Sequence, residues 1–166
     1  MPSSPVNTGT LADQHLMMVG KLTNNAAVCD AILFNSFKHI SGCEYKIAKA
    51  IYFATESLPS KKNIISRISS AIGDEAETAL ILRIVAATEK SNNQRNELSH
   101  ALLRVSPDGT KLTSQNPRRQ VQSHKPVTAA YLGSLLKNST QAHLEAWAAF
   151  QELCVKRGIP PEVNLE

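Results

Sequence analysis

The chain contains few aromatic residues, glycines and prolines, and this scarcity is the first indication of its fold class. Aromatic side chains make up 5% of its 166 residues, and its seven glycines and eight prolines lie mostly near the ends and in predicted loops. Long stretches are therefore free of helix-breaking residues, while 42% of the sequence is hydrophobic. This composition predicts one all-α domain with a core of Ala, Leu and Ile.

Cysteine is also scarce. Cys29, Cys43 and Cys154 are odd in number and lack the spacing of a paired CxxC motif. They therefore predict neither a disulfide framework nor a closed zinc site. His39 and Cys43 are four residues apart, but Ser41-Gly42 between them is expected to end a helix. We therefore expect no metal and no cofactor.

Long apolar runs and a secretory leader are missing as well. The longest apolar stretch, from Thr78 to Ala87, is interrupted by Arg83 and is too short to span a bilayer. The N-terminus has no charged segment followed by an apolar one. We expect a soluble cytoplasmic protein without a membrane partner. Eighteen Lys and Arg against fourteen Asp and Glu give a net charge of +4, which is compatible with RNA as a partner but does not require it.

The apolar residues that are present recur mostly at intervals of three and four, the period of a helix. They predict helices over 11–40, 43–55, 61–72, 75–90, 94–104 and 128–156. Ser60 is the expected N-cap of the third segment, and Asp74 with Glu77 forms a capping pattern for the fourth. Ser91-Asn92-Asn93 is interpreted as a break between the fourth and fifth segments.

Together these helices predict an antiparallel four-helix bundle, with 61–72 as an extra short helix and a small β-hairpin after the third main helix. The helical domain is expected to cover 10–157, between a tail at 1–9 and a tail at 158–166. The hairpin is expected between Val105 and Leu112, around Pro107-Asp108-Gly109. Residues 113–127 are expected to form a polar loop.

A polar cluster, Gln94 to Leu102, adjoins the apolar run and is the stretch that indicates chemistry. If residues 94–104 form a helix, Leu98 and Leu102 face the bundle, while Asn96 and His100 share another side. Arg95 would reach toward them from the first turn, where free amides favour an anion. The three polar side chains could then hold a phosphodiester.

RNA suits such a site because its 2′-hydroxyl is a built-in nucleophile. The enzyme then needs a base, an acid and a cation, but no metal. His100 can transfer protons near neutral pH, Arg95 can bind phosphate oxygens, and Asn96 can donate a hydrogen bond. One such histidine is too few for both proton transfers, which predicts a homodimer with paired sites. Arg104, Arg118, Arg119, His124 and Lys125 are weaker candidates for RNA contacts, or simply solvated.

The Arg-Asn-x-x-x-His pattern of Arg95, Asn96 and His100, followed by a Pro-Asp-Gly hairpin and a long last helix, resembles the HEPN domain superfamily. The resemblance implies a metal-independent endoribonuclease, often a toxin or defence effector, with a composite active site at a dimer interface. Arg95 and His100 would be catalytic and Asn96 supporting. It also implies possible partners, namely an antitoxin or a nucleotidyltransferase.

Two other interpretations remain open. The chain can be a non-catalytic HEPN-like module that dimerises or binds a nucleotide or protein, as many members of that superfamily are inactive. It can also be an unrelated bundle in which the motif is accidental and Arg95 pairs with a carboxylate such as Glu89. Glu97 is interpreted as a surface charge, and His15, His39 and His143 as structural or exposed.

Overall fold

The computed structural model describes residues 11–72, 74–99, 102–105, 112–115 and 125–163. Within this part of the chain five helices follow one another: α1 (Leu11–Ser41), α2 (Tyr45–Ala54), α3 (Leu58–Ile72), α4 (Glu75–Ser99) and α5 (Ala129–Arg157). Three short strands separate the last two helices: β1 (Leu102–Val105), β2 (Leu112–Gln115) and β3 (Lys125–Pro126). The predicted helical bundle is confirmed, but in the described residues three long helices, α1, α4 and α5, form it where four main helices were predicted.

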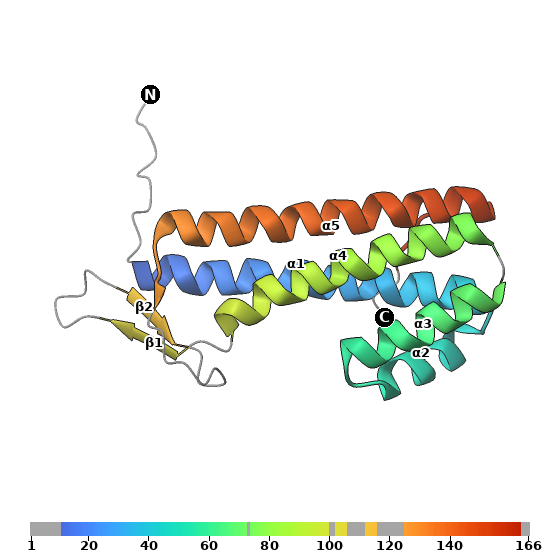
Figure 1. Ribbon diagram of the computed structural model, residues 1–166, viewed down its shortest axis with the longest axis horizontal. Helices are drawn as coiled ribbons and strands as arrows, with labels where there is room; N and C mark the ends of the chain where they lie inside the picture. The colour runs from blue at the N-terminus through green and yellow to red at the C-terminus, as the bar shows by residue number, and fades with distance from the viewer. Residues whose placement is uncertain (1–10, 73, 100–101, 106–111, 116–124, 164–166) are drawn as a thin grey trace, which may run out of the picture.

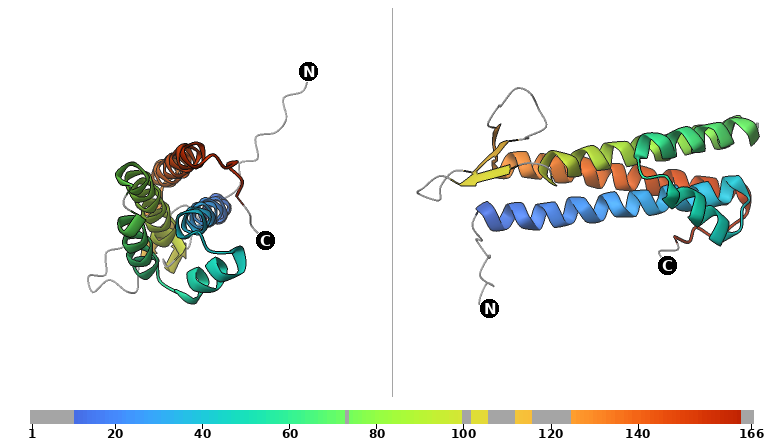
Figure 2. Two further views of the ribbon diagram at one scale, coloured as in Figure 1. Left: turned by 90° about the vertical axis from the view of Figure 1, so that its right-hand side faces the viewer. Right: turned by 90° about the horizontal axis from the view of Figure 1, so that it is seen from below.

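Three long helices, α1, α4 and α5, form the bundle, and α4 runs antiparallel to the other two (Figure 1). α2 and α3 pack beside one end of it, and the strands lie at the other end. The view down the bundle in Figure 2 shows α1, α4 and α5 as the corners of a triangle, with α2 and α3 outside it. None of the described helices is both long and apolar enough to cross a membrane.

Several helix ends are where the sequence predicts them. The side chain of Asp74 accepts hydrogen bonds from the backbone N–H groups of Ala76 and Glu77, at 2.9 and 3.0 Å, and so caps α4. Thr128 caps α5 by accepting from the N–H of Tyr131 at 3.1 Å. α5 ends at Arg157, and the next residue, Gly158, has a φ of 63°. Glycine adopts this left-handed conformation readily because it has no Cβ.

The core consists of two apolar clusters with a polar layer between them. The larger cluster surrounds Phe37 and Phe150, and the smaller surrounds Leu22 and Leu98 near the strands. In the layer between them Ser139 of α5 forms hydrogen bonds with Ser91 of α4, at 3.2 Å, and with Asn25 of α1, at 3.3 Å. These bonds connect all three long helices at one level, because each side chain finds its partner on another helix.

The predicted break at residues 91–93 is wrong, because α4 continues without interruption from Glu75 to Ser99. Ser91 is fully buried and bonded to Ser139, and the amide of Asn92 donates to the carbonyl of Thr88 at 3.1 Å. Neither side chain caps a new helix, because Ser91 is bonded to Ser139 of α5 and Asn92 to the preceding turn of α4. The helix predicted over 94–104 is wrong at both ends, since Leu102–Val105 is a strand.

The start of α3 also differs from the prediction. Ser57, rather than Ser60, precedes the helix, and its hydroxyl oxygen accepts from the N–H of Ser60 at 3.3 Å. Pro59 lies in the first turn, where its missing N–H has no partner to lose. The helix therefore begins at Leu58, three residues before the predicted start at Lys61.

The three strands form an antiparallel sheet in the order β1-β2-β3. Leu102 lies opposite Gln115 and Val105 opposite Leu112, while Thr113 lies opposite Pro126. The predicted polar loop over 113–127 therefore contains strand residues at both ends. The predicted Pro-Asp-Gly turn lies within 106–111, outside the described residues.

Candidate functional site

A groove of about 780 Å³ opens between α1, α4 and the start of α3. α4 lines it with Glu89, Asn92, Asn93, Arg95 and Asn96. α1 contributes Thr23, Ala26, Ala27 and Asp30, and the segment entering α3 contributes Glu56, Leu58, Pro59 and Lys61. Two of the predicted site residues, Arg95 and Asn96, thus line one concave surface.

Arg95 and Asn96 are in direct contact. The Nε and Nη2 atoms of Arg95 both donate to Oδ1 of Asn96, at 3.1 and 2.8 Å. Two donors on one oxygen fix the guanidinium plane relative to the amide, and both side chains are half-buried. The pair is therefore a preformed unit in which the partner of the arginine is neutral.

The position of Arg95 on its helix differs from the prediction. Because α4 has no break, Arg95 lies four residues before its C-terminal residue, Ser99, instead of in a first turn. The free backbone groups at this end are carbonyl oxygens, which favour a cation and disfavour an anion. An anion at this site would be held by the guanidinium, since helix amides are not available there.

The other predicted site residues fall outside the described side chains. His100 directly follows Ser99 in the sequence and lies outside the described residues, as do Arg118, Arg119 and His124. Arg104 is part of β1 and Lys125 of β3, and only their backbones are described. The structure therefore brings together Arg95 and Asn96 and leaves the position of His100 a prediction.

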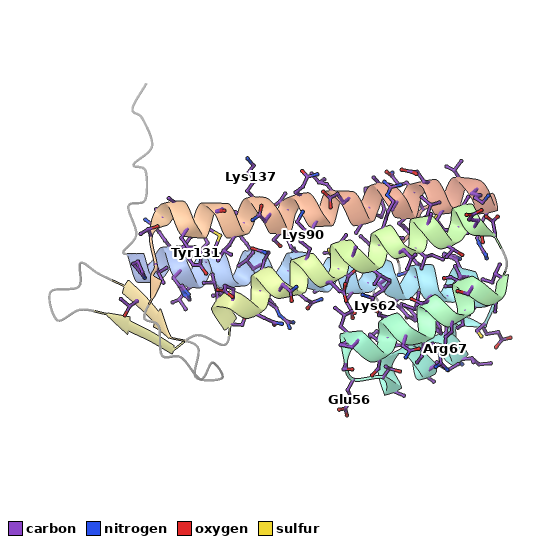
Figure 3. The ribbon with its side chains drawn as sticks, in the orientation of Figure 1. Glu56, Lys62, Arg67, Lys90, Tyr131 and Lys137 are labelled. Carbon is purple, nitrogen blue, oxygen red and sulfur yellow. The ribbon has the colours of Figure 1, made fainter. Side chains whose placement is uncertain are left out.

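The pairing of Arg95 with Glu89, which belonged to the interpretation of the motif as accidental, is not formed. Glu89 accepts from the ammonium of Lys62 at 3.0 and 3.1 Å, and Lys62 extends from α3 toward α4 (Figure 3). Glu97, the other nearby carboxylate, accepts from the hydroxyl of Tyr131 at 3.5 Å. Among the described residues no carboxylate forms an ion pair with Arg95.

Lys61 lies deeper in the groove and is held by Asp30. Its ammonium donates to both carboxylate oxygens, at 3.1 and 3.2 Å, and lies 4.1 Å from the ring centroid of Tyr52. The hydroxyl of Tyr52 donates to the same carboxylate at 2.8 Å. Burial, followed by the charge of Asp30, raises the pKa of Tyr52, so this side chain remains a neutral donor. The cluster joins α1, α2 and α3.

The charges around the groove nearly cancel. Asp30 is paired with Lys61 and Glu89 with Lys62, whereas Glu56 lies on the connection between α2 and α3 and points away from the bundle (Figure 3). In the described lining, Arg95 is the cation whose charge is not already opposed by a carboxylate. An anionic ligand would therefore bind at Arg95.

No described histidine lines the groove. His15 is 3% exposed, and neither of its ring nitrogens has a hydrogen-bond partner in the described part of the chain; burial lowers its pKa. His39 is half-buried, and burial followed by the charges of Lys38 and Arg157 lowers its pKa. His143 is half-buried on α5. Of the three histidines interpreted as structural or exposed, His15 is thus deeply buried, and His39 and His143 are half-buried.

Sequence reasoning missed the role of Asp30, Lys61 and the two asparagines before Arg95. A signal was present in α4: Glu89, Asn92, Asn93 and Asn96 are spaced as i, i+3, i+4 and i+7, which places polar groups along one helical face. The assumed break at 91–93 concealed it. Within the described residues no group of three or more His, Cys, Asp or Glu side chains is arranged to hold a metal ion.

Comparison of the chain with protein-family models, with curated proteins and with solved structures found no match. The fold and the groove describe a helical-bundle protein with an arginine-asparagine pair in a polar groove. Its function is argued below from these residues.

Proposed function

We propose that this protein is a HEPN-like, metal-independent endoribonuclease that cleaves RNA at a site composed of two subunits of a homodimer. The observation that supports the proposal is the contact between Arg95 and Asn96 on the wall of an open groove, with no carboxylate opposing the arginine among the described residues. A guanidinium in this state is available to bind a phosphodiester.

In the proposed reaction His100 removes the proton from the 2′-hydroxyl of the RNA. The resulting oxygen attacks the adjacent phosphorus and displaces the 5′-oxygen of the next nucleotide, which takes a proton from His100 of the second subunit. The products are a 2′,3′-cyclic phosphate and a free 5′-hydroxyl. Arg95 stabilises the negative charge on the phosphoryl oxygens, which is greatest in the transition state.

Asn96 has a positioning role in this scheme. Its Oδ1 fixes the guanidinium of Arg95, and its Nδ2 can donate to a phosphoryl oxygen without changing charge. Arg104, Arg118 and Arg119 would add weaker contacts to the RNA backbone. In a toxin or phage-defence setting an antitoxin or a nucleotidyltransferase would be the controlling partner.

The central test is cleavage of mixed RNA in EDTA by the wild-type protein, by His100→Ala and by a matched control, His143→Ala. We expect wild-type and control to cleave and His100→Ala to lose at least about 100-fold in rate. The products should carry cyclic phosphate ends. Intact RNA with the wild-type protein, or cleavage that survives in His100→Ala, would remove this function.

The homodimer needs its own measurement, because the proposed site lacks a second proton-transfer group within one subunit. Light scattering at micromolar concentration should give twice the monomer mass. A strictly monomeric protein that still cleaves RNA would contradict the composite site while retaining the activity.

A second candidate function is a non-catalytic HEPN-like module that binds a nucleotide or a protein. The near cancellation of charge favours it, because Asp30, Glu56 and Glu89 make the groove less attractive to a polyanion than a basic surface would be. Such a module would bind its partner with equal affinity in wild-type and His100→Ala forms and would leave RNA intact.

A further inference from the structure

The N-terminal half of α1 presents a continuous stripe of residues to solvent. Asp13, Met17, Gly20, Asn24 and Ala27 are all exposed and follow one another at intervals of four, three, four and three residues. A helix packs along a second helix with this spacing, because residues three and four apart share one face. In the right-hand view of Figure 2 this half of α1 forms one edge of the bundle, and no other described helix covers its outer side. The bundle therefore leaves a helix-packing face of α1 uncovered.

This face has a projection and a hollow next to each other. Leu16 and Met17 project from it and are 68% and 53% exposed. Beside them a hollow of about 420 Å³ lies between α1 and α5, and its α1 side is lined by Gly20, Lys21 and Asn24. A Cβ at Gly20 would meet nothing within 4 Å outside its own helix backbone, so the hollow is open there. A second helix that carried the same projection and hollow would fit this surface.

Charge selects the direction in which two copies of this face would meet. Asp13 and Lys21 lie about two turns apart on it, and both are exposed. A parallel pair of helices would place each residue opposite its own copy, so like charges would face each other and so would the two hollows. An antiparallel pair can place Met17 opposite Gly20 of the second copy, which brings Asp13 within about one turn of Lys21 of the second copy. Only the antiparallel pair joins opposite charges and fills the hollows, and a two-fold axis repeats each contact.

From this complementarity we infer that two copies of the chain associate through the exposed face of α1, antiparallel, with Met17 of each copy in the hollow at Gly20 of the other. The stripe reaches the candidate groove, because Ala27 belongs to both. A second copy bound in this way therefore lies beside the groove that contains Arg95. The inference deepens the proposed function by naming the surface of its dimer, and it rests on that function only for the expectation of a homodimer.

The first test is sedimentation equilibrium of the full-length protein at micromolar concentrations. We expect a wild-type dimer, and we expect Met17→Asp to raise the dissociation constant at least about 100-fold, because the two-fold axis doubles the loss of a buried side chain. Leu82→Asp is the matched control, since Leu82 is 45% exposed and lies in the first half of α4, at the end of the bundle away from the start of α1 (Figure 1). It should keep the wild-type constant. A monomeric wild-type protein, or equal effects of the two variants, overturns the inference.

The second test fills the hollow without disturbing the subunit. Gly20→Gln places a long polar side chain where Met17 of the second copy would lie, and association should become at least about tenfold weaker. The subunit should keep its helical circular dichroism, because the new side chain has open space and glycine is a poor helix former. Association as tight as that of the wild-type protein overturns the inference.

The third test reverses the charges. Lys21→Asp should weaken association about tenfold, because it brings like charges together at two places. Adding Asp13→Lys to the same chain should restore the dissociation constant to within about threefold of the wild-type value, since opposite charges then meet again. A double variant as weak as Lys21→Asp overturns the inference, because the antiparallel direction depends on this pair.

RNA cleavage by the same samples separates this inference from the proposed function. A dimer that Met17→Asp leaves intact overturns the α1 contact, while cleavage that is lost in His100→Ala retains the ribonuclease. A dimer that Met17→Asp dissociates, in a protein that leaves RNA intact, retains the α1 contact and removes the ribonuclease.

Discussion

Two half-buried arginines form hydrogen bonds with side chains of α4 near its opposite ends. One of these side chains is a charged carboxylate and the other is a neutral amide. Arg157 of α5 donates to both oxygens of Glu77, at 2.9 and 2.6 Å, and to the backbone carbonyl of His39. Arg95 donates to the neutral amide of Asn96. The charge of Arg157 is thus neutralised by a carboxylate. The guanidinium of Arg95 is held in one orientation by an uncharged amide.

The comparison separates two uses of the same side chain. Arg157 joins the ends of α1, α4 and α5, and its charge is neutralised within the fold. Arg95, at the edge of a groove, has no opposing carboxylate among the described residues; such a charge adds little to stability but is what binding an anion requires. Removing Arg157 should therefore affect folding, and removing Arg95 should affect ligand binding.

The largest expected effect is on activity in Arg95→Ala. Loss of the guanidinium should lower the rate of RNA cleavage by at least about 100-fold, because the charge on the phosphoryl oxygens is then unopposed. The free energy of unfolding should change by only about 0.5 kcal/mol, since the group lost is an arginine near a helix C-terminus. Cleavage assays and urea unfolding provide the two measurements.

The matched control for this prediction is Arg83→Ala, which removes another α4 arginine. Arg83 forms an exposed ion pair with Glu152 at 3.0 Å, away from the groove. Its loss should leave cleavage unchanged and alter stability by about 0.5 kcal/mol or less. Equal losses of activity in both variants would mean that Arg95 acts through general surface charge and not at a site.

The next effect in size is on stability, in Glu77→Gln. Glu77 is 8% exposed, and its removal leaves the guanidinium of Arg157 half-buried without a charged partner. We expect the free energy of unfolding to fall by about 2–3 kcal/mol, less than for a fully buried pair because Arg157 retains some solvent contact. Cleavage per folded molecule should not change. Glu152→Gln, at the exposed pair, should cost about 0.5 kcal/mol or less in urea unfolding.

The parts of the fold that could be predicted from the sequence depend on residues that lie close together along the chain. The helical period along α1 and α5 and the cap at Asp74 are local features, and each is present in the structure. The break at 91–93 was mispredicted because the partner of Ser91 is Ser139, 48 residues away. No local pattern reveals that the hydroxyl of Ser91 will find its partner on another helix.

The candidate site could be predicted only in part for the same reason. The contact between Arg95 and Asn96 joins adjacent residues, so the motif indicated it. The groove itself depends on α3 crossing beside α4 and on Asp30 meeting Lys61, a pair 31 residues apart. Its near-neutral charge therefore became visible only in the folded chain, whereas the row of asparagines was concealed in the sequence by the predicted break at 91–93.

A smaller difference is expected between neighbouring lysines at the groove. Lys61→Met removes the ammonium from a pair whose side chains are 11% and 31% exposed, and it leaves Asp30 with Tyr52 as its remaining donor. Unfolding free energy should fall by about 1–2 kcal/mol. Lys62→Met breaks a pair that is 45% and 36% exposed, so the change should stay within about 0.5 kcal/mol. Similar values for the two variants in urea unfolding would contradict the view that the groove has a buried, structural side.

The smallest effect concerns the charge that caps α4 at the end where Arg157 binds. Hydrogen bonding by the backbone N–H of Glu77, followed by the bond from Lys156, lowers the pKa of Asp74. A carboxyl group whose pKa is lowered in the folded state stabilises the fold above its unfolded pKa, and this contribution disappears as the pH falls through the folded pKa. Asp74→Asn keeps a capping oxygen but removes the charge.

The wild-type protein should therefore unfold at a slightly higher urea concentration than Asp74→Asn at pH 7, and the difference should shrink between about pH 5 and pH 3. High salt should reduce it at pH 7, because the group is exposed and its interaction with Lys156 is screened. A gap that stays constant down to pH 3 would show that the substitution acts through cap geometry. Of the ion pairs that Glu77 and Asp74 form with α5, only the buried pair of Glu77 would then stabilise the fold, and the contrast with the open groove around Arg95 would be sharper.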